Sequence, residues 1–294
     1  MRVSFLKTPD HGIFVLLAVV ILSIGCKKDK DNPQDTFDPA IARTLLNEKY
    51  GSGERQEADV YLPANRSGNT AVVILLHGGS WMEGNKTDLT EVVNTIRVQW
   101  PQAAIINMNY KLANNTPANF HPAQMNDIRQ MLVYLNEKKG LWQVGEKVAL
   151  TGVSAGAHLA LLYSYAFDNE QKVKAVVDIV GPTDLSDPFY TNNLLFQVVL
   201  TNYLGKTWQQ DPDLHRSASP ALRVTATSPP TFMAYGGLDP LVPVSNAVTL
   251  RNRLQNNGVA HTYLLYPNEG HEFSTPVIND MVPQVVQFLK SNLE

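Results

Sequence analysis

The sequence has a single cysteine, Cys26, and no excess of positive charge over its 294 residues. One cysteine cannot form a disulfide within the chain, and its place near the N-terminus removes cysteine chemistry from the mechanisms we consider. Lys and Arg number 24 against 27 Asp and Glu, which gives a formal net charge of -3. The chain therefore lacks the basic excess that holds a phosphate backbone, and we expect no nucleic-acid partner.

Signatures of bound metals and nucleotides are missing as well. The sequence contains no H-E-x-x-H motif, and Asp127, Asp178 and Asp184 do not follow a spacing typical of metal ligands. The glycines of "GEKVALTGVSAG" do not form G-x-G-x-x-G or a phosphate-binding loop. We expect no metal and no cofactor.

The first 26 residues differ in composition from the rest of the chain. A positive start at Arg2 and Lys7 precedes an apolar run from Ile13 to Gly25, which is shorter than the roughly 20 residues that span a bilayer. The run ends in "LSIGC", which resembles a bacterial lipobox, so residues 1–25 are predicted to be a lipoprotein signal peptide and Cys26 its lipidated residue. An ordinary secretory signal and an uncut anchor are the alternatives.

These features predict a lipid-anchored protein of the cell envelope, facing either the periplasm or the cell surface. After Cys26 the stretch "KKDKDNPQDTFDPA" is charged and has no apolar periodicity, so residues 26–40 are predicted to be a flexible tether. The membrane would be contacted only through the lipid. Residues 41–294 are expected to form one domain.

Residues 41–294 alternate between apolar strands and amphipathic helices. With 44% hydrophobic and 17% charged residues, the chain can bury a sizeable core. Nearly continuous apolar strands between helices are typical of an α/β fold whose sheet is mostly parallel and covered on both faces. The expected strands are 57–63, 71–77, 103–110, 147–152, 173–181, 230–236 and 261–267, and the clearest expected helices are 87–100, 122–140, 155–165 and 277–294.

Residues capable of chemistry follow several of these strands. "HGGSW", "GVSAG", "GGLDP" and "NEGHEF" each come directly after an expected strand. In an open α/β sheet, ligands bind beyond the carboxyl ends of the strands, where loops leave for helices. The four segments are therefore expected to meet at one edge of the sheet.

In their order along the chain, "HGGSW", "GVSAG", "YLGKT", "SASP", "GGLDPLVP" and "NEGHEF" resemble the α/β-hydrolase superfamily, specifically esterases of the hormone-sensitive-lipase and bacterial feruloyl or acetylxylan esterase type. The resemblance runs from about Gln56 to Phe288. It implies an α/β-hydrolase fold with an eight-stranded, mostly parallel sheet and a small cap insert at 182–219. It also implies a serine carboxylesterase that acts on short acyl esters, with acetyl or feruloyl groups on carbohydrate as the expected substrates.

Ser154 lies at the turn from an expected strand into an expected helix. Such a sharp turn strains the residue within it, and Gly152 and Gly156 would relieve crowding so that the hydroxyl is exposed. The alternative is that Ser154 only caps the helix. A serine hydroxyl is a poor nucleophile without a base, so the interpretation as a nucleophile requires a histidine and a group to orient it.

Seven histidines occur, and His271 is the one that follows the last strand, where the family places its base. Asp239, after the preceding strand, completes the chain order Ser, Asp, His that this fold uses. Asp184 is the competing acid, and Glu272, next to the base, is expected to point elsewhere. Ser154, Asp239 and His271 are thus the predicted catalytic residues.

The resemblance also implies an oxyanion hole. Its expected donors are backbone N–H groups of Gly78, Gly79, Ser80 and Ala155. The commoner motif is H-G-G-G, and Ser80 replaces its third glycine without removing a backbone donor. Trp81 is predicted either to line the substrate pocket or to pack in the core. The insert aromatics Phe189, Tyr190, Tyr203 and Trp208 are open to the same two interpretations.

Two other functions remain open. A peptidase or amidase of the prolyl-peptidase or formamidase type would share these motifs, although the chain has no room for a propeller domain. A non-catalytic surface module that binds carbohydrate is the second, but a binding module has no need to keep all three catalytic positions. The sequence does not determine the oligomeric state.

Overall fold

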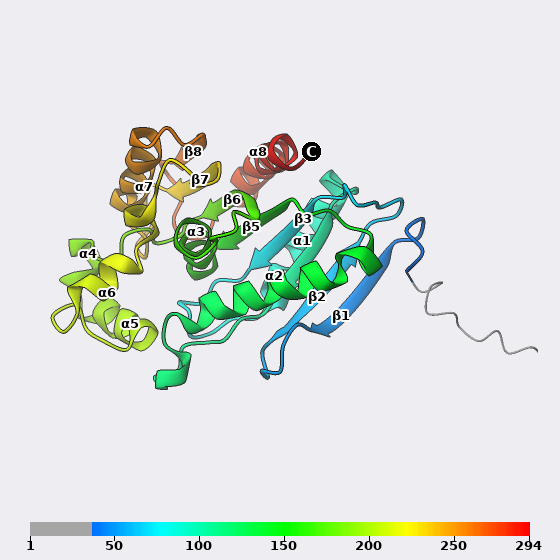
Figure 1. Ribbon diagram of the computed structural model, residues 1–294. Helices are drawn as coiled ribbons and strands as arrows, with labels where there is room; N and C mark the ends of the chain where they lie inside the picture. Colours follow the sequence, from blue (N-terminus) through cyan, green and yellow to red (C-terminus); the bar gives the residue numbers. More distant parts are fainter. Residues whose placement is uncertain (1–36) are drawn as a thin grey trace, which may run out of the picture. The chain divides into compact units, whose positions relative to one another are not determined.

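An eight-stranded sheet runs through residues 37–294, the part of the chain that this computed structural model describes (Figure 1). Its strand order is β1-β2-β4-β3-β5-β6-β7-β8, antiparallel at the β1, β2 and β4 pairings and parallel from β4 to β8. The strands are β1 (Arg43–Lys49), β2 (Glu57–Leu62), β3 (Val72–Leu76), β4 (Ala104–Met108), β5 (Val148–Val153), β6 (Val173–Ile179), β7 (Thr231–Gly236) and β8 (His261–Tyr266). The predicted fold class, an α/β fold with a mostly parallel eight-stranded sheet, is confirmed.

The two faces of the sheet carry separate hydrophobic clusters. All residues of β3 are buried, and their side chains alternate, so that Ile74 belongs to one cluster and Leu75 to the other. Helices α2 (Ala123–Trp142), α3 (Ala155–Ala166) and α7 (Val244–Asn256) pack on the face of Ile74, whereas α1 (Thr90–Gln99) and α8 (Thr275–Leu293) pack on that of Leu75. Burial on both faces explains why the central strands read as continuous apolar runs.

The domain begins earlier than the sequence suggested. The guanidinium of Arg66 is buried and donates hydrogen bonds to the carbonyls of Phe37, Pro39 and Ile41. The prediction that the flexible tether reaches residue 40 is therefore wrong for residues 37–40, because a buried cation holds their backbone in place. The predicted signal peptide, Cys26 and the rest of the tether lie outside the described residues.

Two further elements differ from expectation. Strand β1 was not expected, because its residues are half-buried or exposed and form no apolar run at this edge of the sheet. Helix α2 continues through Gly140 to Trp142 and ends at Gln143, which has a left-handed backbone. Burial of the Trp142 side chain outweighs the roughly 1 kcal/mol that a glycine costs within a helix.

Short helices fill the segment between β6 and β7. They are α4 (Pro188–Thr191), α5 (Leu194–Leu204), α6 (Pro212–Ser217) and the 3-10 turn η4 (Pro220–Arg223). They lie beyond the carboxyl ends of the central strands (Figure 1). Within residues 37–294, no helix is both long and apolar enough to cross a bilayer.

Candidate active site

Three loops at the carboxyl edge of the sheet bring Ser154, His271 and Asp239 into contact. His271 Nε2 lies 3.0 Å from the Ser154 hydroxyl, and His271 Nδ1 lies 2.7 Å from an Asp239 carboxylate oxygen. Ser154 follows β5, Asp239 follows β7 and His271 follows β8. A base that contacts both a hydroxyl and a buried carboxylate can take the hydroxyl proton and hold the resulting positive charge.

Ser154 has the strained backbone expected of a sharp strand-to-helix turn. Its φ is 55° and its ψ is -122°, and its side chain caps no helix N–H group. A Cβ atom at Gly152 would lie 2.3 Å from Gly156 C, and one at Gly156 would lie 2.2 Å from the Leu76 carbonyl oxygen. Both glycines are therefore required by close backbone approach, and the interpretation of Ser154 as a helix cap loses its support.

The Asp239 carboxylate is held by its own turn. One oxygen accepts hydrogen bonds from the backbone N–H groups of Leu241 and Val242, and the other faces His271. The side chain of Asp239 is fully buried, while that of His271 is 19% exposed. The His271 imidazole is thus open to solvent, whereas the Asp239 carboxylate is fixed and shielded.

The loops that carry Asp239 and His271 contact each other. Leu238 N–H donates to the carbonyl of Glu269, and a Cβ atom at Gly236 would lie 2.1 Å from the carbonyl oxygen of Gly270. The "GG" before Leu238 therefore allows two loops to touch. The alternative acid, Asp184, accepts hydrogen bonds from Ser186 within its own turn, and Glu272 is exposed.

The loop after β3 presents backbone N–H groups next to Ser154. Gly79, Ser80 and Trp81 all have positive φ, at 108°, 50° and 63°. Within the described chain, no backbone hydrogen bond is donated by the N–H groups of Gly79 or Ser80 to another loop or turn residue. Gly78 lies against Ser154, since a Cβ atom there would lie 3.4 Å from Ser154 Cβ.

Ala155 supplies a further N–H group at the first residue of α3, where a helix has no internal acceptor. Of the four residues predicted for the oxyanion hole, Gly78 and Ala155 therefore lie next to Ser154, and Gly79 and Ser80 follow Gly78 in the same loop. Which of their N–H groups bind the oxyanion remains a prediction.

A cluster of buried and half-buried polar side chains, formed by His77, Tyr110 and Arg55, lies beneath this loop and was not predicted from the sequence. Burial lowers the pKa of His77 to about 4, so its ring is neutral; Nδ1–H donates to the Gly78 carbonyl at 2.7 Å, and the ring stacks on Tyr110. The hydroxyl of Tyr110 donates to the His77 carbonyl, and Arg55 donates to the carbonyl of Gly84. The signals in the sequence were that His77 begins "HGGSW" and that Tyr110 ends the expected strand 103–110.

Trp81 lies in the packed interior rather than along an open pocket. Its side chain is 4% exposed and stacks on Tyr203, with ring centroids 4.5 Å apart. Of the insert aromatics, Tyr190 and Tyr203 are also buried, and Trp208 is half-buried beside the Arg216 guanidinium. Burial favours the packing interpretation for Trp81, Tyr190 and Tyr203 over the interpretation as pocket lining.

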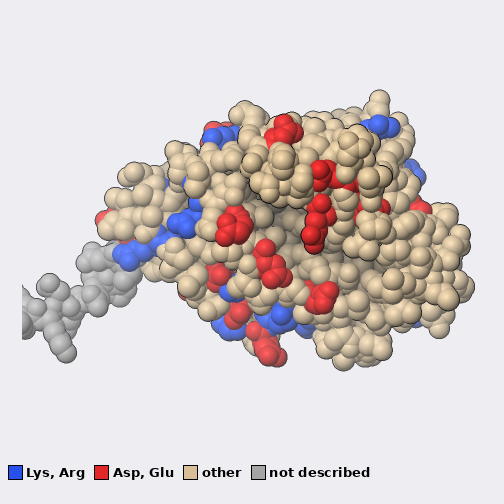
Figure 2. Space-filling model, turned by 180° about the vertical axis from the view of Figure 1, so that it is seen from behind, with Lys and Arg blue, Asp and Glu red and all other residues tan. Residues whose placement is uncertain are grey.

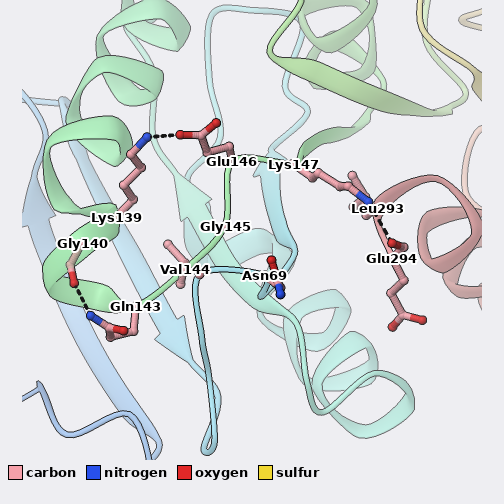
Figure 3. A pocket seen from close by; sticks show the side chains of 11 residues that line it. Asn69, Lys139, Gly140, Gln143, Val144, Gly145, Glu146, Lys147, Leu293 and Glu294 are labelled. Atoms are coloured by element: carbon pink, nitrogen blue, oxygen red, sulfur yellow. Dashed lines mark hydrogen bonds and ion pairs between the residues drawn. The ribbon is translucent and has the colours of Figure 1, made fainter.

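A cavity of about 750 Å³ lies elsewhere in the domain (Figure 3). It is lined by residues that precede β3 and β5, including Asn69 and Glu146, and by the end of α8, so it opens at the edge opposite Ser154. Its polar groups pair with one another, as Lys139 does with Glu146. Ser154, Asp239 and His271 do not line this cavity.

Charged groups are unevenly distributed on the molecular surface. The face shown in Figure 2 is mostly uncharged, and Asp and Glu side chains border a hollow near its middle. Negative potential around that hollow disfavours anionic ligands there. Among residues 37–294, no three His, Cys, Asp or Glu side chains gather as a metal site requires.

Solved structures share this architecture. A truncated carbohydrate esterase from gut microbiota matches with a TM-score of 0.71 at 22% identity, covering 87% of this chain and 98% of that one. An esterase of Pyrobaculum calidifontis matches with a TM-score of 0.69 at 21% identity, covering 88% of this chain and 87% of that one. At such identities the likeness establishes the fold, which is the α/β-hydrolase fold.

The BD-FAE family matches residues 58–254, more than half of the chain, and the chain belongs to that family. Esterase LipC of Mycobacterium tuberculosis is 26% identical over 242 residues, which cover 76% of this chain and 58% of LipC. Kynurenine formamidase of Danio rerio is 26% identical over 190 residues, which cover 62% of this chain and 57% of that enzyme. The chain thus spans less than two thirds of the length of these curated relatives.

Proposed function

We propose that this chain is a serine carboxylesterase whose nucleophile is Ser154. The observation that carries the proposal is the position of His271, which contacts Ser154 at 3.0 Å and Asp239 at 2.7 Å. Membership of the BD-FAE family and similarity to esterase LipC support the same reaction class. The fold alone would not, because α/β-hydrolase folds carry several chemistries.

In the proposed reaction, the Ser154 oxygen attacks the ester carbonyl while His271 Nε2 takes the hydroxyl proton. Asp239 keeps Nδ1 protonated and stabilises the imidazolium, and the backbone N–H groups around Ser154 bind the oxyanion. His271 then returns the proton to the leaving alcohol, and an acyl-enzyme remains. Water, deprotonated by His271, attacks that ester, and the carboxylic acid leaves with Ser154 restored.

The proposed substrates are short acyl esters, with acetyl or feruloyl groups on carbohydrate as the natural candidates. The short insert of α4, α5 and α6 favours a small acyl group over a long chain. The carbohydrate part rests on the resemblance of the sequence and on the name of one structural neighbour. The lipid anchor at Cys26 and the envelope location stay predictions from the sequence.

The test is hydrolysis of p-nitrophenyl esters from acetate to octanoate by the purified chain. We expect the highest kcat/KM on acetate, and we expect Ser154→Ala to lower kcat by on the order of 10⁴-fold or more. Ser164→Ala is the matched control, since Ser164 is a buried serine on the same helix whose hydroxyl donates only to the Ala160 carbonyl. Release of acetate or ferulate from xylan then tests the carbohydrate substrate.

An amidase is the second candidate, because kynurenine formamidase is among the relatives. Hydrolysis of p-nitroacetanilide, measured beside p-nitrophenyl acetate, separates the two reactions. Faster turnover of the anilide would favour the amidase. An inactive chain on both substrates would favour a binding module.

A further inference from the structure

The loop at residues 78–81, here called the oxyanion loop because it carries three of the four predicted oxyanion donors, is strained. It lies far in the sequence from helix α3, which it faces. Two non-glycine residues in succession, Ser80 and Trp81, have positive φ, and each such residue costs on the order of 1 kcal/mol or more. A strained loop keeps its shape only where contacts outside it fix that shape. The contacts of the Trp81 side chain with residues outside the loop hold it in this conformation.

The indole of Trp81 is hydrogen-bonded to the nucleophile helix. Its Nε1–H donates to His158 Nδ1 at 3.1 Å, and the two residues are 77 positions apart. His158 lies one turn after Ser154 in α3, and its backbone N–H donates to the Ser154 carbonyl at 3.0 Å. The loop and the nucleophile are thus joined through one buried imidazole.

The protonation of that imidazole is fixed by its two partners. An indole N–H can only donate, so His158 Nδ1 must accept, and the ring proton resides on Nε2. Nε2–H then donates to the Ala218 carbonyl at 2.8 Å. His158 is fully buried, and burial lowers its pKa to about 3, so the neutral ring persists at physiological pH.

The insert between β6 and β7 contributes to the same cluster. Tyr203 of α5 stacks on the Trp81 indole with an interplanar angle of 12°, and Ala218 follows α6. The Trp81 carbonyl also accepts a hydrogen bond from Ala113 N–H at 2.9 Å. Trp81 is therefore held on several sides, yet its contact with His158 is the hydrogen bond that reaches the helix of the nucleophile.

We propose that His158 is a positioning residue: by accepting the Trp81 indole N–H, it holds the N–H groups of Gly79 and Ser80 opposite that of Ala155 above Ser154. This inference rests on the proposed esterase function. It assigns to His158 no contact with substrate and no proton transfer. Loss of the hydrogen bond misplaces oxyanion donors, which lowers kcat because the donors act mainly in the transition state.

The test compares His158→Leu, His158→Asn and Trp81→Phe by kcat and KM on p-nitrophenyl acetate. His158→Leu removes the acceptor, and we expect kcat to fall about 10- to 100-fold with KM changed less than about threefold. Asn places an amide oxygen near the position of Nδ1, so His158→Asn should regain most of the kcat that His158→Leu loses. Trp81→Phe removes the donor and should match His158→Leu, with no further loss in the double variant.

The control is Tyr165→Phe, which removes another buried hydrogen bond of α3, the one to Thr231 at 2.6 Å. It should lower the melting temperature without lowering kcat. The inference is overturned if folded Trp81→Phe or His158→Leu has the kcat of wild type. It is also overturned if Tyr165→Phe loses as much kcat as they do. Should His158→Leu fail to fold, Trp81→Phe decides. A wild-type chain without esterase activity contradicts the proposed function instead, and this inference falls with it.

Discussion

At the scale of single residues, two buried carboxylates near Ser154 have different hydrogen-bond partners. Asp239 faces His271, whereas Asp178, on β6, is fully buried and accepts hydrogen bonds from the Tyr235 hydroxyl and the Gly181 N–H. Burial raises the pKa of Asp178 to about 7, against the lowering effect of these two hydrogen bonds. Asp178 therefore fixes the turn after β6, whose Ile179 carbonyl accepts the Ser154 N–H at 2.8 Å.

The raised pKa of Asp178 predicts a specific pH dependence of stability. Above pH 3.8 the folded protein keeps a proton on Asp178 that the unfolded chain releases. The stabilisation that Asp178 contributes to the folded state is therefore complete below pH 3.8 and is lost as the pH rises through about 7. Asp178→Asn retains a neutral side chain at every pH. Its free energy of unfolding, relative to wild type, should therefore rise by on the order of 1 kcal/mol per pH unit between about pH 4 and 7.

Urea denaturation of both proteins across this pH range measures the difference. Contributions from the buried histidines are common to wild type and variant, so they cancel. A constant difference would show that Asp178 is ionised in the folded protein throughout the range.

The sequence was sufficient to predict that Ser154, Asp239 and His271 lie together, because each is in a motif directly after a strand, and the structure places their side chains in contact. It was not sufficient to pair Trp81 with His158, which are 77 residues apart. Neither residue carries a local signal of that contact, since the hydrogen bond exists only after α3 packs against the loop after β3. The buried side chain of Trp81 likewise could not be told from a pocket residue before the insert was placed.

At the scale of elements, α3 lies unusually close to the sheet, and Gly156 permits the approach. A Cβ atom there would lie 2.2 Å from the Leu76 carbonyl oxygen and 2.4 Å from that of His77. Neither neighbour can yield without moving β3 or the oxyanion loop. Backbone contact therefore limits how far α3 can shift, in addition to the packing of its side chains in the core.

Gly156→Ala should accordingly destabilise the fold by about 1–3 kcal/mol and lower esterase activity. Gly140→Ala is the matched control, because Gly140 lies within α2 and a Cβ atom there meets nothing within 4 Å. That change should stabilise the protein by about 0.5–1 kcal/mol and leave activity unchanged. Thermal and urea unfolding of both variants measure the effects, and shifts of the same sign would contradict the role assigned to Gly156.

At the scale of the whole molecule, the alternation of apolar strands with helices in the sequence predicted most of the sheet. Strands β3 to β7 are covered on both faces, and their sequences are therefore apolar runs. Edge strand β1 and the start of the domain at Phe37 were missed. Their stability comes from pairing with β2 and from carbonyls bound by Arg66, and neither interaction leaves an apolar pattern in the sequence.

Reaction with diethyl p-nitrophenyl phosphate shows which residue of this chain is the nucleophile, and we expect it to be Ser154. The Ser154 oxygen should displace one p-nitrophenolate per chain and remain bound to phosphorus, with the adduct on the peptide that contains Ser154. Labelling should be absent in Ser154→Ala and much slower in His271→Ala, which lacks the base. Equal labelling of Ser154→Ala, or an adduct on another residue, would show that Ser154 is not the nucleophile.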